Sequence, residues 1–200
     1  MIRVNIDRLL ADTELANRFF AELDNGAVAV LPTDTLYGFA VAAHSTSAVD
    51  RVYRIKSRSS QKPLILFVSC IDDLASLGIE TPPGVRSQLL QHWPGALTAV
   101  LPAAKHQALA AFTFGSIGVR VPAHPSLLQL LGRLPCRILT TSANRSGDPS
   151  DNNPDLIAAE FSDEIDWLID DGILPPGLPS TVVDFSRVPP IILRQGKIKV

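Results

Sequence analysis

Short apolar runs alternate with amphipathic stretches along almost the whole chain. The runs are rich in Val, Ile, Leu and Ala and are bounded by Pro, Gly or hydroxyl residues, a pattern that predicts strands. They stand at residues 27–31, 37–42, 64–68, 97–101, 117–121, 137–141, 166–169, 181–185 and 191–194. Because Pro lacks the N–H that a strand ladder needs, it should border such runs, as Pro32, Pro63, Pro102 and Pro122 do.

Apolar residues three or four positions apart predict helices between several of these runs. One helix starts at a cap formed by Asp12 or Thr13 and stops before Gly26. Others are predicted at residues 47–55, 85–93 and 127–134. Strands and helices that alternate without a repeat or a long linker favour one domain over residues 1–200. Its predicted class is α/β or α+β, with a twisted mixed sheet flanked by helices.

Composition narrows the class of protein. Hydrophobic residues make up 46% and charged residues 19% of the chain, and the net charge is −2, which excludes a disordered chain. The longest uncharged run, residues 87–104, contains Pro, Gly and Gln residues that no membrane-spanning helix would tolerate. Arg3, Asp7 and Arg8 interrupt the apolar stretch that a secretory signal needs. We therefore expect a cytoplasmic protein without a membrane partner.

The cysteines and histidines form no recognisable site motif. Cys70 and Cys136 are too few for a disulfide framework, and both are interpreted as small core residues. The four histidines lack zinc-ligand spacing, so no metal site built by the protein is predicted. Ser142, His124 and Asp184 could form a triad on paper, but Ser142 lacks the G-x-S-x-G context of such a nucleophile.

The near-neutral total charge hides a segregation of charge along the chain. Five of the 18 basic residues lie between Arg51 and Lys62, whereas residues 146–186 hold ten acids and no Lys or Arg. The acidic segment is interpreted as a solvated helix face with loops. The basic residues 56–63 lie between a predicted helix and a predicted strand, so they belong to a loop, where binding groups are usually displayed. With Arg120 and Arg194, the basic segment from Arg51 to Lys62 is expected to form an anion pocket.

Four further loops carry hydroxyl groups and fixed charges next to strand ends, at residues 32–38, 115–122, 140–144 and 179–184. Each alone is also an ordinary turn or cap sequence. If they converge, they build a cationic, hydroxyl-lined pocket for an anionic ligand, because Arg offers a planar fork to carboxylate or phosphate. The chain has neither G-x-x-x-x-G-K-[ST] nor G-x-G-x-x-G opening a helix, so a nucleotide would be held in another way.

Taken together, these loops resemble those of the YrdC/TsaC family. The resemblance runs from about Ala27 to Gly196 and rests on a combination of motifs in family order. These are P-T-D-T-L-Y-G at 32–38, K-S-R at 56–58, P-L at 63–64, W-P-G at 93–95, V-R-V-P at 119–122, S-A-N at 142–144, P-S-T-V-V-D at 179–184 and L-R-Q-G at 193–196.

The resemblance implies a YrdC-like fold and a threonylcarbamoyl-AMP synthase. Such an enzyme converts L-threonine, bicarbonate and ATP to threonylcarbamoyl-AMP and pyrophosphate, the activated intermediate for N6-threonylcarbamoyladenosine in tRNA. A functional link to the transferase proteins of that modification is therefore expected. Binding of ATP implies Mg²⁺, for which the sequence shows no dedicated cage of ligands.

The same resemblance assigns site residues by position. The catalytic set is Lys56, Arg58, Ser142 and Asn144. The ATP-binding set is Arg58, Lys62, Ser116, Ser142, Ser150 and Arg194, and the threonine-binding set is Thr35, Arg120, Thr140 and Ser180. Phe67 stands where many family members have a histidine, which removes one expected contact with threonine. Longer relatives carry an additional C-terminal domain, whereas this chain, ending at Val200, is expected to be of the short, single-domain type.

A rival hypothesis from another class is a non-catalytic RNA-binding module of the same fold, in which the basic segment contacts tRNA or another structured RNA. Two Trp and two Tyr provide little aromatic surface for stacking bases. The K-x-R and S-x-N pairs are also both present. These features favour the enzyme, with weak RNA binding as an additional property.

Overall fold

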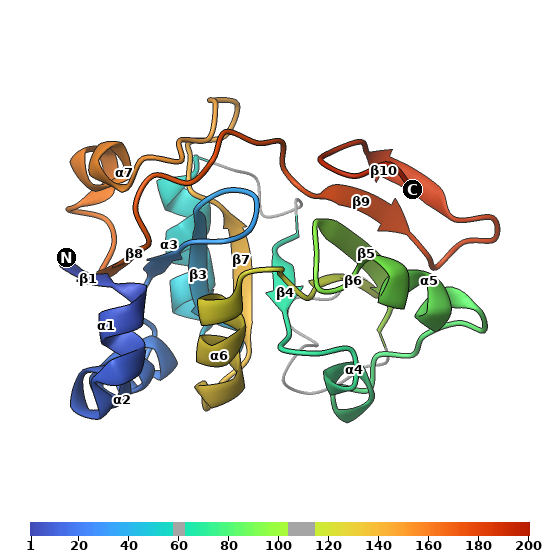
Figure 1. The fold of residues 1–200 in the computed structure, drawn as a ribbon, viewed down its shortest axis with the longest axis horizontal. Coiled ribbons are helices and arrows are strands. Elements are labelled where there is room, and N and C mark those ends of the chain that lie inside the picture. Colours follow the sequence, from blue (N-terminus) through green and yellow to red (C-terminus); the bar gives the residue numbers. More distant parts are fainter. Residues whose placement is uncertain (58–62, 104–114) are drawn as a thin grey trace.

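The computed structural model describes residues 1–57, 63–103 and 115–200, which form one ten-stranded sheet with seven helices (Figure 1). The strands are β1 (Ile2–Asn5), β2 (Ala29–Leu31), β3 (Gly38–Ala42), β4 (Ile65–Phe67), β5 (Leu97–Pro102), β6 (Ser116–Arg120), β7 (Ile138–Ser142), β8 (Trp167–Asp170), β9 (Thr181–Asp184) and β10 (Ile191–Arg194). The helices are α1 (Ile6–Ala11), α2 (Thr13–Asp24), α3 (Thr46–Ile55), α4 (Asp73–Ser76), α5 (Val85–His92), α6 (Pro125–Arg133) and α7 (Pro154–Phe161).

The sheet is mixed, with the strand order β1-β8-β2-β3-β7-β4-β6-β5-β9-β10. Four neighbouring pairs are parallel: β1 with β8, β8 with β2, β4 with β6, and β5 with β9. The other five pairs are antiparallel. The expected mixed sheet is therefore confirmed, and each predicted strand is present with ends shifted by no more than two residues.

The elements that the sequence pattern did not predict are short, with eight residues or fewer. Strand β1 has four residues and pairs in parallel with β8. Helix α1 follows directly, capped by the side chain of Asn5. Helix α4 spans a single turn of four residues. Helix α7 lies in the acidic segment and begins at the cap residue Asn153, with Pro154 in its first turn.

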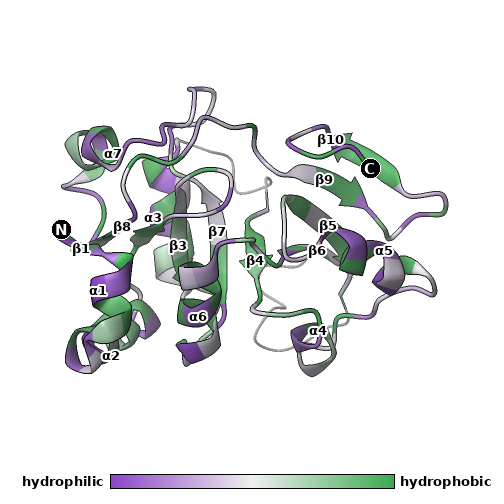
Figure 2. Ribbon diagram, in the orientation of Figure 1, coloured by the Kyte–Doolittle hydropathy of each residue, from purple (hydrophilic) through white to green (hydrophobic). Residues whose placement is uncertain are grey.

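Alternate side chains of the central strands enter two separate cores, one on each face of the sheet. Val28, Val30 and Phe39 pack into a first cluster covered by α3, α5 and α7, whereas Ala29 and Leu31 pack into a second cluster covered by α1, α2 and α6. The central strands β3 and β4 are mostly hydrophobic, while the helices carry both hydrophobic and hydrophilic turns (Figure 2). Both faces are buried, which fixes the strand ends that carry the loops.

The cysteines differ from expectation. Cys70 is exposed, so its interpretation as a core residue is wrong: its backbone N–H donates to Asp73 in the turn that opens α4. Cys136 is half-buried and packs against the second cluster. Among the described helices, none combines the length and the apolar character needed to cross a bilayer.

Candidate active site

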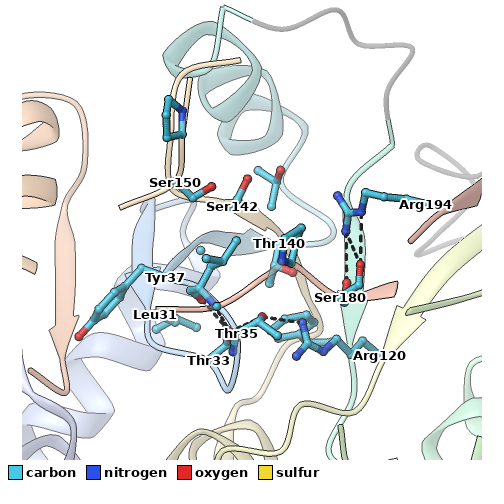
Figure 3. Close-up of a pocket in the computed structure, with 17 residues that line it drawn as sticks. Leu31, Thr33, Thr35, Tyr37, Arg120, Thr140, Ser142, Ser150, Ser180 and Arg194 are labelled. Atoms are coloured by element: carbon cyan, nitrogen blue, oxygen red, sulfur yellow. Dashed lines mark hydrogen bonds between the residues drawn. The ribbon is translucent and has the colours of Figure 1, made fainter. Parts of the chain in front are cut away.

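A cavity of about 420 Å³ opens where loops from several strands meet (Figure 3). Its lining residues are Leu31, Thr33, Thr35, Leu36, Tyr37, Gly38, Phe67, Arg120, Thr140, Thr141, Ser142, Pro149, Ser150, Gly177, Pro179, Ser180 and Arg194. They come from the β2–β3 connection, the ends of β4, β6, β7 and β10, and the segments around residues 149–150 and 177–180. Leu31 and Phe67 also belong to the second core cluster, so part of the cavity surface is continuous with the core.

The hydroxyl of Thr33 shapes the connection between β2 and β3. It donates to the carbonyl of Leu36 at 2.6 Å and accepts from the backbone N–H groups of Thr35 and Leu36 at 3.0 and 3.1 Å. The hydroxyl oxygen of Thr35 lies 3.0 Å from that of Thr33. Thr35 Oγ1 also accepts a hydrogen bond from Arg120.

Arg120 is a buried cation, 3% exposed, at the end of β6. Its Nε donates to the carbonyl of Gly95 at 2.9 Å, Nη1 to Thr35 Oγ1 at 3.0 Å and Nη2 to Asp34 Oδ1 at 2.6 Å. The ring of Phe67 lies 5.9 Å from the guanidinium carbon, within the range of a cation–π contact. Burial lowers the pKa of Arg120 and the Asp34 carboxylate opposes that shift. The guanidinium thus stays charged in the cavity wall.

Arg194, at the end of β10, lines the same cavity as Arg120. Its Nη2 donates to the carbonyl and the hydroxyl of Ser180 at 3.0 and 3.3 Å (Figure 3). The Ser180 hydroxyl lies 2.8 Å from that of Thr98 on the adjacent strand β5. Gly196 allows the chain end to pack here, because a Cβ on it would stand 2.2 Å from the carbonyl oxygen of Pro179.

Lys56, at the C-terminal cap of α3, is 2% exposed and binds the S-A-N segment. Its ammonium donates to the carbonyl oxygens of Ser142 and Asn144 at 2.6 and 2.7 Å and to Asn144 Oδ1 at 2.9 Å. Asn144 Oδ1 also accepts the Ser142 hydroxyl at 2.6 Å, while its Nδ2 donates to the carbonyls of Arg145 and Asp148. An ammonium has three donors, and these three acceptors match them.

Arg145 ties the same segment to α3 a second time. Its guanidinium donates to the carbonyl of Ile55, at the end of α3, and forms an ion pair with Glu164. Glu160 lies 3.3 Å from its Nε. The hydrogen bond that Arg145 donates to the Glu164 carboxylate raises the pKa of Arg145. The acidic residues of α7 and the segment after it therefore serve as counterions that anchor the loop carrying Ser142.

The predicted site residues fall into four groups. Seven line the cavity: Thr35, Arg120, Thr140, Ser142, Ser150, Ser180 and Arg194. Lys56 and Asn144 lie behind Ser142 and reach the cavity through it. Ser116, at the start of β6, pairs with Pro102 and is not among the lining residues. Arg58 and Lys62 lie outside the described residues.

The expected convergence of basic residues holds in part. Arg120 and Arg194 line one cavity, and Lys56 adjoins it. Arg51 does not take part, and its inclusion in the anion pocket is wrong: it lies in the middle of α3 and forms an ion pair with Asp166 at 2.6 Å. Charge density along the sequence therefore overstated the pocket, because residues close together on a helix can point in different directions.

Several residues that shape the cavity were not singled out from the sequence. Thr33 folds the first loop, Asp34 pairs with Arg120, and Arg145 anchors the S-A-N segment. The sequence feature that could have identified Thr33 and Asp34 is their place in the P-T-D-T motif. The role of Arg145 depends on contacts with α3 and Glu164, 19 positions away, and no local pattern encodes it.

The oxygen atoms that the cavity could offer to a metal ion belong to hydroxyl and carbonyl groups and not to a cluster of carboxylates. No Asp or Glu is among the lining residues that the structure describes. Within the described parts of the chain, no group of three or more His, Cys, Asp or Glu residues is placed to hold a metal. This donor set suits a Mg²⁺ ion that receives most of its ligands from a bound polyphosphate.

Several known proteins are similar to this chain in sequence and in fold. The model of the Sua5/YciO/YrdC family, described as "Telomere recombination", matches residues 21–196. The chain is 34% identical over 174 residues to the threonylcarbamoyl-AMP synthase of Pyrococcus abyssi, covering 86% of this chain and 51% of that protein. It is 36% identical over 186 residues to the human threonylcarbamoyl-AMP synthase, covering 87% of this chain and 64% of the other. The chain thus spans half to two thirds of the length of these relatives.

Solved structures of similar proteins have the same fold as this chain. The structure of P. abyssi Sua5 complexed with L-threonine superposes with a TM-score of 0.83 at 30% identity, covering 98% of this chain and 56% of that one. Escherichia coli YciO superposes with a TM-score of 0.84 at 25% identity, covering 94% of this chain and 92% of the other. With the family model covering most of its length, this chain belongs to the Sua5/YciO/YrdC family.

Proposed function

We propose that this chain makes threonylcarbamoyl-AMP and pyrophosphate from L-threonine, bicarbonate and ATP. The observation that carries the proposal is the buried guanidinium of Arg120 in a hydroxyl-lined cavity that Arg194 also lines. The names of the similar synthases support this reaction, and the L-threonine held by the similar P. abyssi Sua5 supports an amino-acid substrate.

The amino acid would occupy the part of the cavity around Arg120. Arg binds carboxylates through two parallel N–H donors, and Arg120 is held in place by Gly95, Thr35 and Asp34. Thr140 donates its hydroxyl proton to the carbonyl of Ile65, which leaves its oxygen as an acceptor for the substrate. Phe67 gives this part an apolar wall in place of the family's histidine, so threonine would be held here without that contact.

ATP would occupy the part lined by Ser142, Ser150 and Arg194. In the reaction, an oxygen of the N-carboxylated threonine bonds to the α-phosphorus. The bond from that phosphorus to the oxygen bridging to the β-phosphate breaks, and pyrophosphate leaves. This chain's contribution is to place the reactants and to balance their negative charges. Lys56 directs its donors to protein oxygens, so it holds the Ser142–Asn144 segment in position. Mg²⁺ bound to the phosphates would supply further charge neutralisation.

The test is pyrophosphate release from ATP. It should require both L-threonine and bicarbonate, and it should fall severely in Asn144→Ala and in Arg58→Ala, the latter chosen from the family motif. Arg86→Gln is a matched control, because Arg86 is exposed and pairs with Asp72 on the surface. Turnover that is independent of threonine, or variants that keep full activity, would overturn the proposal. A non-catalytic RNA-binding module would instead bind RNA with a steep salt dependence and release no pyrophosphate.

A further inference from the structure

Asp34 lies beside the proposed threonine position but does not line the cavity. Its carboxylate contacts Arg120 Nη2 at 2.6 Å, and both side chains are largely buried, with exposed fractions of 12% and 4%. Lys197 also reaches Asp34, but it donates to the backbone carbonyl, at 2.7 Å, and not to the carboxylate. The Asp34 carboxylate therefore bonds to Arg120 and holds its guanidinium in position from outside the cavity.

The hydrogen bonds of Arg120 to the protein leave two of its N–H donors for a ligand. A guanidinium has five N–H donors, one on Nε and two on each terminal nitrogen. Gly95 takes the Nε donor, Thr35 takes one donor of Nη1 and Asp34 takes one donor of Nη2. Among the described residues, one N–H on each terminal nitrogen has no protein acceptor, so Arg120 keeps donors for a bound carboxylate.

The pairing with Asp34 also changes the charge that a ligand meets. A buried arginine without a counterion would attract any anion, and a polyphosphate more strongly than an amino acid. This cavity is proposed to take both a zwitterion, at Arg120, and a polyanion, near Arg194. A carboxylate behind Arg120 leaves its directional donors in place while cancelling most of its net charge.

Building on the proposed function, we propose that Asp34 is a positioning and specificity-determining residue: it fixes the Arg120 fork for an amino-acid carboxylate and keeps phosphate out of that position. Asp34 does not touch the substrate and acts through Arg120. The positioning of Arg120 and the exclusion of phosphate can be separated. Asn at this position keeps a hydrogen-bond acceptor for Arg120 but removes the negative charge. A longer carboxylate keeps the charge but displaces the fork.

The test is calorimetric binding of L-threonine in the absence of ATP, repeated with inorganic phosphate as competitor. In the wild type, phosphate at tens of millimolar should not displace threonine. In Asp34→Asn, the Kd for threonine should change less than about 3-fold, whereas phosphate should compete at least 10-fold more strongly. In Asp34→Glu, threonine binding should weaken at least 10-fold while phosphate remains a poor competitor. Asp72→Asn, which removes an exposed acid that pairs with Arg86 on the surface, should behave as the wild type.

The outcomes separate this inference from the proposed function. A wild type that binds no L-threonine contradicts the function itself. Threonine binding with equal phosphate competition in the wild type and in Asp34→Asn contradicts the role of Asp34 alone. Loss of threonine binding in a folded Asp34→Asn protein also overturns it, because that result would mean direct contact with substrate. Even if Asp34→Asn does not fold, two other results would refute the inference. One is displacement of threonine by phosphate in the wild type, and the other is unchanged threonine binding in Asp34→Glu.

Discussion

The ammonium of Lys56 lies 2.9 Å from Oδ1 of Asn144, and this contact sets the orientation of the Asn144 amide. A flipped amide would bring its NH₂ group against the ammonium and turn its oxygen toward the carbonyls of Arg145 and Asp148. The observed orientation makes Oδ1 the acceptor for the Ser142 hydroxyl at 2.6 Å. A buried charge thereby decides the direction of a hydroxyl in the cavity wall.

Lys56→Met should destabilise the protein and lower the rate of pyrophosphate release. The substitution leaves buried carbonyl oxygens of Ser142 and Asn144 without their charged donor, and each lost bond of this kind costs about 1.5–3 kcal/mol. Denaturant unfolding and kinetics measure both effects. Arg54→Met, on the exposed side of the same helix, should change neither. A Lys56→Met protein with wild-type stability and a raised KM for ATP alone would indicate a direct phosphate contact instead.

Gly196→Ala should raise the KM for ATP and lower the melting temperature. A methyl group at this position would stand 2.2 Å from the carbonyl oxygen of Pro179 and 2.5 Å from the carbonyl carbon of Ser180, so the backbone that accepts from Arg194 must shift. Steady-state kinetics and thermal unfolding measure the result. Gly132→Ala is the control, because nothing lies within 4 Å of a Cβ there. Equal behaviour of the two variants would contradict the tight packing of the chain end.

Stability should fall at high pH through Tyr37. Burial raises the pKa of Tyr37 from 10.0 to about 12, and its hydroxyl donates to the carbonyl of Gly172 at 2.8 Å. Because the folded state holds this proton more tightly, the contribution is complete below pH 10 and is lost as the pH rises toward 12. The loss amounts to about 2–3 kcal/mol. Unfolding of the wild type and of Tyr37→Phe across this range measures it, and an unchanged slope in the variant would contradict the assignment.

Arg194→Gln should raise the KM for ATP at least 10-fold, whereas Arg51→Gln should leave it unchanged. Arg194 lines the cavity, whereas Arg51 pairs with Asp166 away from it. Initial rates at varied ATP concentration, with threonine and bicarbonate saturating, compare the two variants. An equal effect of both substitutions would mean that the overall charge, and not the cavity, controls ATP binding.

Periodicity predicted the strands well because the sheet is buried on both faces, so Val30, Phe39 and their neighbours had to be apolar. It did not predict β1, which is short and partly exposed, or α7, which has only eight residues and lies in the acidic segment. The family motifs located Thr35, Arg120 and Ser142 because their roles belong to local loops. The counterions of Arg120 and Arg145 arise from chain segments brought together by folding, as when Arg120 meets Asp34 across 86 positions.

The most direct test of the proposed function is mass spectrometric detection of the product. The purified protein, incubated with ATP, Mg²⁺, L-threonine and bicarbonate without RNA, should form threonylcarbamoyl-AMP in an amount equal to the pyrophosphate released. Omission of threonine or of bicarbonate should abolish both products. Pyrophosphate released without threonylcarbamoyl-AMP, or no turnover of ATP under these conditions, would contradict the account.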